Sequence, residues 1–534
     1  MTAADSIVLA SKIHTLDPEK PAATALAIRG GRIAAVGHYR EVERHRGADT
    51  VIHDYGQATI VPGLNDSHTH VVSGLDLARG LQLTDKEPLA EVQLIVRNAA
   101  EATGSDGWVT GWGVDPNLFS ESGFNGRIFD EATGAVPMFL RMRDGHSAVV
   151  NSAALAAAGI TGRVDFSDES FIDVDDDGRP TGYLVEFSAI DLVMKVLPQE
   201  PFEVRAEQLR GVLNGMSEVG ITSTHVMDFA EGSGDLIAHL ETVGDLPLRL
   251  RFSPWVNAGA SLVELEEAAA LQGAGGRRWR VEGVKFFIDG TIDNGSAWLE
   301  TPDSYGENKE SVWTDPEDFQ KALRFFIDRG IPTATHAIGD KGVRYVLEAL
   351  EAAGDSRDLA AHRIEHIETL PDELIARFAK LGVAASMQPV HGTHHTRADR
   401  TDNWSVRLGP ERAARGWRCR DLREAGVTVA LGSDWPITPF DPRAMMADSI
   451  LRRPVERPDL EPIQPEQALT PLMALEGYTS HAAYAAGHSL ETGTITVGKR
   501  ADLTVMGSDP LQVSAEELAR TIIVTTFVDG RPTR

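Results

Sequence analysis

Cysteine, basic residues and long apolar runs are all scarce in this chain of 534 residues. Cys419 is the single cysteine, which excludes an internal disulfide and suggests a reducing compartment. No apolar stretch reaches the ~18 residues of a membrane helix, and the first residues lack the basic and apolar segments of a signal peptide. We therefore expect a cytoplasmic protein without a membrane span.

Positive charge is also in deficit, with 51 Lys and Arg against 79 Asp and Glu and a net charge of −28. This balance argues against nucleic acid and anionic membranes as partners, because both carry negative charge themselves. The expected partner is a small molecule, and we also allow for a homodimer.

Both ends of the chain are rich in short strands, whereas the middle alternates strands and helices. We expect residues 1–60 and 485–534 to form one composite β-sandwich domain, and residues 61–484 to form the main domain. Eight main-domain strands are predicted, at 59–64, 221–226, 248–256, 281–289, 332–336, 363–367, 383–388 and 427–434. Repeated β–α units of this number indicate an α/β fold, a (β/α)8 TIM-like barrel, interrupted by an α/β insertion at about 80–200.

Histidines and charged residues recur near the carboxyl ends of these strands. His68 and His70 stand at i and i+2 on an extended segment, so their side chains share a face. The other candidates belong to strands four, five, six and eight: Lys285, His336, His366 and Asp434. Imidazoles and carboxylates are ligands of zinc and similar metals. The set therefore predicts a metal site, although any single histidine has an ordinary alternative in the core or in a loop.

Lys285 lies in an apolar strand, where desolvation lowers the pKa of the amine and favours its neutral form. A neutral amine can add carbon dioxide, and the resulting carbamate is able to bridge two divalent metals. The alternative is a buried lysine paired with Asp289 or Glu365.

Eight segments spread over nearly the whole chain carry a family resemblance: VPGLNDSHTH, DGHSAVVNSAAL (144–155), VKFFIDGT, HAIGD, RIEHIE, SMQPVH (386–391), GVTVALGSDWPITPFDP (426–442) and GTITVGKRADLTVM (493–506). Together they resemble the amidohydrolase superfamily, and within it the amidohydrolase 3 branch that includes N-substituted formamide deformylase. The resemblance implies a barrel with a composite β-sandwich. The chain departs from the pattern at Asn65, where aspartate is commoner, and in the loop 291–296, so substrate specificity does not transfer.

The resemblance also implies how the ligands divide between metals: His68, His70 and Asp434 for one, His336 and His366 for the other, and carbamylated Lys285 between them. Zinc is the expected ion, in one or two copies. A bound water with its pKa lowered to about 7 would attack the substrate carbonyl. Asp434 would act as general base and then acid. His146 would donate to the carbonyl oxygen, unless it is a structural histidine of the insertion.

Three further residues are predicted to contact the substrate: Trp112, Asp289 and His391. Trp298 and Trp404 are also candidates for an apolar pocket wall, although ordinary packing explains each tryptophan alone. His394 and His395 follow strand seven and would line either the pocket or a solvated loop.

Three classes of function remain open. They are an amidohydrolase cleaving an amide or formamide, a deaminase or lactone/ester hydrolase of the same superfamily, and a non-catalytic binding protein. Deaminases usually carry a glutamate three residues after the strand-five histidine, where this chain has Gly339. The acidic segment 173–178 resembles the start of a calcium loop, but Leu184 replaces its final glutamate, so an acidic turn is predicted.

Overall fold

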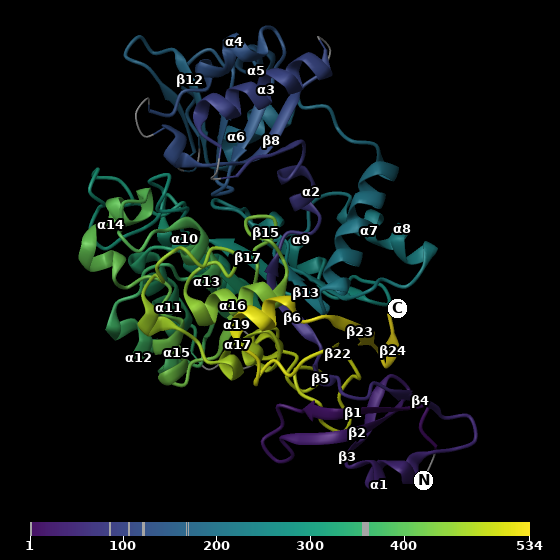
Figure 1. Ribbon diagram of the computed structural model, residues 1–534. Coiled ribbons are helices and arrows are strands. Elements are labelled where there is room, and N and C mark those ends of the chain that lie inside the picture. Colours follow the sequence, from purple (N-terminus) through teal and green to yellow (C-terminus); the bar gives the residue numbers. More distant parts are fainter. Residues whose placement is uncertain are drawn as a thin grey trace.

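Strands from both ends of the chain form one eight-stranded sheet in the computed structural model, which describes residues 3–84, 87–104, 107–119, 123–166, 168, 170–354 and 362–533 (Figure 1). Its members are β1 (Ser6–His14), β2 (Ala22–Arg29), β3 (Arg32–Gly37), β4 (Val51–Asp54), β5 (Thr59–Pro62), β22 (Leu503–Met506), β23 (Ile523–Val528) and β24 (Arg531–Pro532). The two ends meet where β22 pairs antiparallel with β5. Gly30 and Gly31 make the predicted hairpin between β2 and β3, both at positive φ, which glycine adopts readily.

Parallel strands form the centre of the main domain, in the orders β16-β14-β13-β6 and β15-β17-β18-β19-β20-β21. They are β6 (Leu64–Thr69), β13 (Ile221–Val226), β14 (Arg249–Phe252), β15 (Trp255–Val256), β16 (Trp279–Val281), β17 (Val284–Phe287), β18 (Thr333–Ala337), β19 (Arg363–His366), β20 (Ala384–Met387) and β21 (Val429–Leu431). β14 and β15 are consecutive along the chain, and so are β16 and β17. β14 pairs with β16 in the first sheet, and β15 pairs with β17 in the second. At the last strands of the two orders, a parallel bridge joins Thr69, at the end of β6, to Trp435, which follows β21.

The predicted first strand, 59–64, is wrong as a single element. Its first part is β5 of the terminal sheet, and β6 begins only after Gly63. A Cβ at Gly63 would lie 2.2 Å from the Thr222 hydroxyl, so only glycine allows the chain to pass between the two sheets there. As a result His68 lies inside a strand, and His70 directly follows it.

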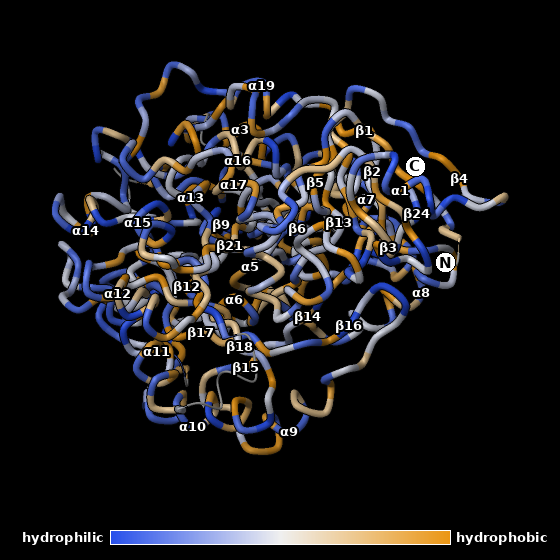
Figure 2. The backbone as a smooth tube through the Cα atoms, turned by 90° about the horizontal axis from the view of Figure 1, so that it is seen from below, coloured by the Kyte–Doolittle hydropathy of each residue, from blue (hydrophilic) through white to orange (hydrophobic). Residues whose placement is uncertain are grey.

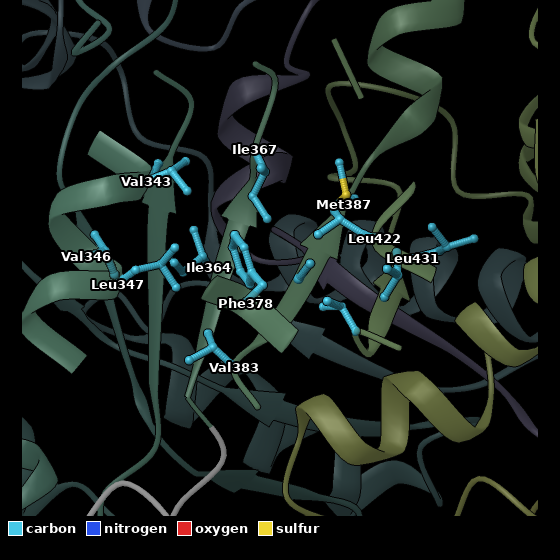
Figure 3. Close-up of a cluster of buried hydrophobic side chains, with 14 of the residues drawn as sticks. Val343, Val346, Leu347, Ile364, Ile367, Phe378, Val383, Met387, Leu422 and Leu431 are labelled. Carbon is cyan, nitrogen blue, oxygen red and sulfur yellow. The ribbon is translucent and has the colours of Figure 1, made fainter. Parts of the chain in front are cut away.

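Helices alternate with the parallel strands as predicted. They include α7 (Phe202–Glu218), α8 (Ser233–Val243), α9 (Leu262–Ala270), α10 (Pro316–Ile327), α11 (Asp340–Ala352), α12 (Asp372–Leu381), α13 (Pro389–His395), α14 (Asn403–Ala413), α15 (Cys419–Glu424) and α16 (Pro442–Leu451). Hydrophobic and hydrophilic residues recur along α11 and α12 (Figure 2), giving each helix one apolar face. Val346, Leu347 and Phe378 project from these faces into a core shared with Ile364 of β19 (Figure 3).

Residues between β6 and α7 form a separate six-stranded sheet, seen at the top of Figure 1, where an α/β insertion is predicted. Its strands are β7 (Leu81–Gln82), β8 (Val109–Val114), β9 (Met138–Met142), β10 (Ser147–Val150), β11 (Phe171–Val174) and β12 (Pro180–Val185). The helices of this part include α2 (Ser73–Leu77), α3 (Leu89–Thr103), α4 (Asp130–Thr133), α5 (Ser152–Ala157) and α6 (Phe187–Met194). Among the described residues, no helix combines the length and apolar character needed to cross a bilayer.

Candidate metal centre and active site

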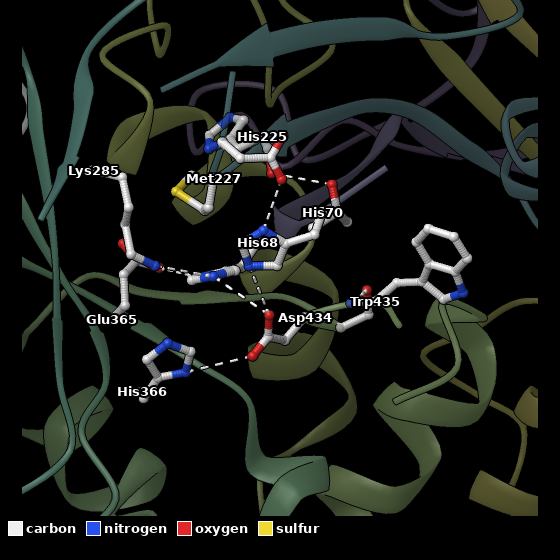
Figure 4. A network of polar contacts seen from close by, with 12 residues as sticks. His68, His70, His225, Met227, Lys285, Glu365, His366, Asp434 and Trp435 are labelled. Carbon is white, nitrogen blue, oxygen red and sulfur yellow. Dashed lines mark hydrogen bonds and ion pairs between the residues drawn. The ribbon is translucent and has the colours of Figure 1, made fainter. Parts of the chain in front are cut away.

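Two carboxylates fix the histidines at the end of β6. The Nδ1 atom of His68 lies 2.6 Å from Glu365 Oε2, and that of His70 lies 2.8 Å from Asp228 Oδ2. A carboxylate on Nδ1 orients an imidazole and leaves Nε2 free to bind a metal. Both Nε2 atoms face the Oδ1 atom of Asp434, at 3.5 Å and 3.3 Å (Figure 4).

The second oxygen of Asp434 faces another pair of histidines. Its Oδ2 atom lies 3.9 Å from His366 Nδ1 and 3.7 Å from His391 Nε2. Both nitrogens are buried and have no hydrogen-bond partner among the described residues, which is unusual unless a ligand completes the site. Asp434 thus belongs to two candidate ligand groups, one with His68 and His70 and one with His366 and His391. In each group the ligand atoms lie within 4.8 Å of one another.

Three residues of this centre have left-handed backbone conformations. Asp434 has a φ of 57°, His366 of 72° and Ile367 of 54°. Outside glycine, and above all for a β-branched residue such as isoleucine, this conformation costs of order 1–3 kcal/mol and is found mainly where function requires it. The chain therefore bends at His366, where β19 ends, and at Asp434, shortly after β21 ends.

Lys285 projects from β17 into the same centre and is fully buried. Its Nζ atom lies 3.3 Å from His68 Nε2 and 4.9 Å from the ring centre of Phe287. Burial lowers the pKa of its amine to about 8. Among the described residues, no ion pair joins it to Asp289 or Glu365, although the charges of Glu365 and Asp434 oppose the lowering of its pKa. Lys285 lines the cavity described below.

His336, predicted as a metal ligand, lies beside His366. Its ring centre lies 4.4 Å from that of His366, but its Nε2 atom lies 3.1 Å from the carbonyl oxygen of Gly290. Within the described part of the chain it joins no group of three ligands, whereas His391, predicted as a substrate contact, does. A backbone acceptor thus engages Nε2 of His336, which leaves Nδ1 as the nitrogen that could hold a metal.

The sequence did not identify Arg363 and Asp228 as residues that orient the ligands. Arg363 lies 2.5 Å from Glu365 Oε1 through its Nε atom, and 2.6 Å from His225 Nδ1 through Nη1. Alternation along β19 places Arg363 and Glu365 on one face, which is a signal that the sequence contained. Asp228 follows the end of β13 and had no such signal.

The insertion completes a cavity of about 640 Å³ above these ligands. His146, from the turn between β9 and β10, lies with its ring centre 5.2 Å from that of His336. Its Nδ1 atom lies 2.8 Å from Glu186 Oε2. Burial lowers the pKa of His146, but the Glu186 carboxylate outweighs this and raises the pKa above its ordinary value.

Glu186 connects the insertion to the loop that follows β17. Its Oε1 atom accepts hydrogen bonds from Ser296 Oγ at 2.6 Å and from Asn294 Nδ2 at 3.3 Å. Glu186 also has a positive φ of 64°. The unusual loop 291–296 therefore helps to hold the carboxylate that orients His146.

The remaining predicted residues divide between the cavity and its surroundings. Trp404 and His395 line the cavity, and so does Asp289, although its carboxylate accepts hydrogen bonds from three backbone N–H groups. Trp112, predicted as a substrate contact, is buried in β8 of the inserted sheet and does not line the cavity. Trp298 and His394 do not line it either.

The predicted acidic turn is present. Asp175 accepts hydrogen bonds from the backbone N–H groups of Asp177 and Arg179, between β11 and β12.

A sequence model of the amidohydrolase family matches residues 52–534. The chain belongs to the amidohydrolase family. This assignment confirms the prediction of a metal-dependent hydrolase of the amidohydrolase type.

Three proteins illustrate the similarity. Protein LONG AFTER FAR-RED 3 of Arabidopsis thaliana is 29% identical, covering 99% of this chain and 91% of its own. N-substituted formamide deformylase of Arthrobacter pascens is 26% identical, covering 98% of this chain and 97% of its own. A crystal structure of a metal-dependent hydrolase from Pyrococcus horikoshii superposes with a TM-score of 0.72 at 23% identity, covering 96% of this chain and 99% of the other.

Proposed function

We propose that this amidohydrolase cleaves the C–N bond of a small amide or formamide. The observation that carries the proposal is Asp434, which directs one oxygen toward each of two histidine pairs at the floor of a large cavity. The relative from Arthrobacter pascens, named for its action on N-substituted formamides, supports the substrate class. In this proposal the parallel strands close into a (β/α)8 barrel, and the terminal strands form a composite β-sandwich.

The residues fit one or two divalent metals, with zinc expected. His68 and His70 have their Nδ1 atoms engaged by carboxylates and their Nε2 atoms directed at Asp434, as metal-binding histidines require. His366 Nδ1 and His391 Nε2 are buried nitrogens that have no hydrogen-bond partner in the part of the chain that the structure describes. When bound, such a metal supplies a water whose pKa is lowered to about 7 and polarises the substrate carbonyl.

The residues of the chain move the protons. Asp434 takes a proton from the attacking water, whose oxygen bonds to the carbonyl carbon. Asp434 then passes that proton to the substrate nitrogen as the C–N bond breaks, giving an acid and an amine. His146, held through Nδ1 by Glu186, directs its other nitrogen to the carbonyl oxygen.

Lys285 is proposed to act as a carbamate. Its neutral amine would form a bond to the carbon of carbon dioxide and release one proton, leaving an anionic oxygen pair beside His68. The full burial of the amine supports this, because burial lowers its pKa and favours the neutral form that reacts with carbon dioxide.

A substrate panel tests the proposed function. The holoenzyme would be assayed with N-formyl amines, N-acyl amines, lactones and nucleobases. Turnover of formyl or acyl amines is expected. Turnover of nucleobases or lactones alone would replace the proposal by a deaminase or a lactone hydrolase, and a metal-loaded protein without turnover would indicate a binding protein.

Metal content provides the first quantitative prediction. Purified protein should carry about one to two divalent ions per chain by elemental analysis, and 1,10-phenanthroline should remove them together with activity. His70→Ala should lose metal, because His70 is one of three ligands in its group. His239→Ala, an exposed histidine on α8, is the control and should keep both metal and activity. Full activity in metal-free protein would refute the metal site.

Glu186 provides a second prediction. Glu186→Gln should lower kcat roughly tenfold to a hundredfold with little change in metal content, because His146 loses the carboxylate that orients it. Asp130→Asn removes a carboxylate of the same insertion, whose partner is Ser152, and should leave kcat unchanged. Equal kcat values for the two variants would show that His146 needs no such support.

A further inference from the structure

Three aromatic rings from separate elements meet in the cavity. Phe187 begins α6 of the insertion, Trp255 lies on β15, and Phe287 ends β17. Their ring centres lie 5.1 Å apart for Phe187 and Trp255, 5.1 Å for Trp255 and Phe287, and 5.7 Å for Phe187 and Phe287. All three are half-buried and line the cavity, and together they are called the aromatic wall.

The aromatic wall offers only carbon to the cavity. The single polar side-chain atom in it, Trp255 Nε1, donates a hydrogen bond to the carbonyl oxygen of Met227 at 2.5 Å. An uncharged polar group placed against these rings would lose its hydrogen bonds to water and gain none. An apolar group would gain by leaving water there, and aromatic rings prefer the offset and edge contacts already seen within the wall.

The insertion supplies one side of the wall through α6. Ala189, Ile190 and Val193 are buried against the inserted sheet. Phe187 and Met194, at i and i+7, both line the cavity, and Met194 also packs against the cluster of the insertion. The helix therefore serves both the packing of the insertion and the lining of the cavity.

The wall also borders the candidate catalytic residues. The ring centre of Phe187 lies 5.0 Å from that of His146, and that of Phe287 lies 5.2 Å from that of His336. The ring centre of Trp255 lies 6.5 Å from that of His70. A group resting on the wall is therefore next to the reacting bond. A cavity of about 640 Å³ is much larger than a formyl or acetyl group requires and falls within the range of small-molecule sites.

We propose that the aromatic wall is a subsite for a flat, uncharged apolar substituent, such as an aryl group, attached close to the amide that is cleaved. The inference rests on the proposed function, because it defines the substrate within that reaction. It makes Phe187, Trp255 and Phe287 determinants of specificity.

Ketones that cannot be hydrolysed test the subsite apart from turnover. 1-Phenylpropan-2-one and butan-2-one differ by a phenyl in place of a methyl group, and aminoacetone replaces that group by a cation. Their dissociation constants would be measured on the holoenzyme by titration calorimetry. We expect 1-phenylpropan-2-one to bind roughly tenfold or more tightly than the other two.

Two aromatic clusters of the chain supply a matched pair of variants. Phe187→Ala should bring the ratio of the phenyl and methyl dissociation constants close to one. Phe229 also contacts two aromatic residues, Phe252 and Trp279, but outside the cavity lining, so Phe229→Ala should leave the ratio unchanged. Metal content and circular dichroism would confirm that each variant is folded. If Phe187→Ala does not fold, Trp255→Leu takes its place in the same comparison.

The outcomes separate the subsite from the reaction. Equal affinities for the phenyl and methyl ketones in the unmodified enzyme, or tightest binding of aminoacetone, would overturn the aromatic subsite even if amides are hydrolysed. Preference for the phenyl ketone without turnover of any amide would leave the subsite in place and refute the proposed reaction instead.

Discussion

Asp434→Asn is expected to lower kcat on a formyl or acyl amine by roughly 10²–10⁴ while the protein stays folded. Asparagine keeps the shape of the side chain but removes the charge and the proton acceptor. Asp434 also stands in both ligand groups, so the variant should bind metal more weakly as well. Steady-state kinetics at saturating metal, with metal content from elemental analysis, separate the loss of the proton carrier from the loss of metal.

Asp441→Asn is the matched control for this variant. Asp441 follows in the same loop and caps α16 by accepting a hydrogen bond from the backbone N–H of Arg443, at a distance from the cavity lining. Asparagine caps helices about as well as aspartate, so fold and rate should both be kept. A rate within a few-fold of wild type for Asp434→Asn, or its unfolding, would mark that residue as structural.

The strand ends were predictable because their signals are local. Apolar runs followed by His336, His366 or Asp434 can be read within a few residues, and each of these residues lies near the end of a parallel strand. The family motifs added the order in which these strand ends carry ligands. The prediction of one continuous first strand was wrong because the apolar run gives no sign that Gly63 divides it between two sheets.

The orienting residues were not predictable in the same way. Glu365 is far from His68 in the sequence, and the positive φ of Glu186 has no signal in a residue that is not glycine. His391 is close to Asp434 because α13 places it there, which a sequence without coordinates cannot show. Trp112 lies outside the cavity lining, which its sequence context could not show, because an aromatic residue in a strand is equally suited to a core and to a pocket.

Lys285→Ala is expected to lose one metal and to lower activity by roughly a hundredfold or more, since a catalytic metal contributes several kcal/mol to the transition state. Partial rescue by a small carboxylic acid such as acetate or propionate would follow if the lost group is a carbamate, because the acid restores an anionic oxygen pair beside His68.

Lys341→Ala is the control that isolates this effect. Lys341 also has its Nζ atom over an aromatic ring, 4.8 Å from the centre of Trp298, but it lies outside the cavity lining. Loss of its cation–π contact should change neither metal content nor rate. Intact-mass measurement of the unmodified enzyme under carbon dioxide should detect the added carbamate. An active, fully metal-loaded enzyme with an unmodified Lys285 would refute the carbamate.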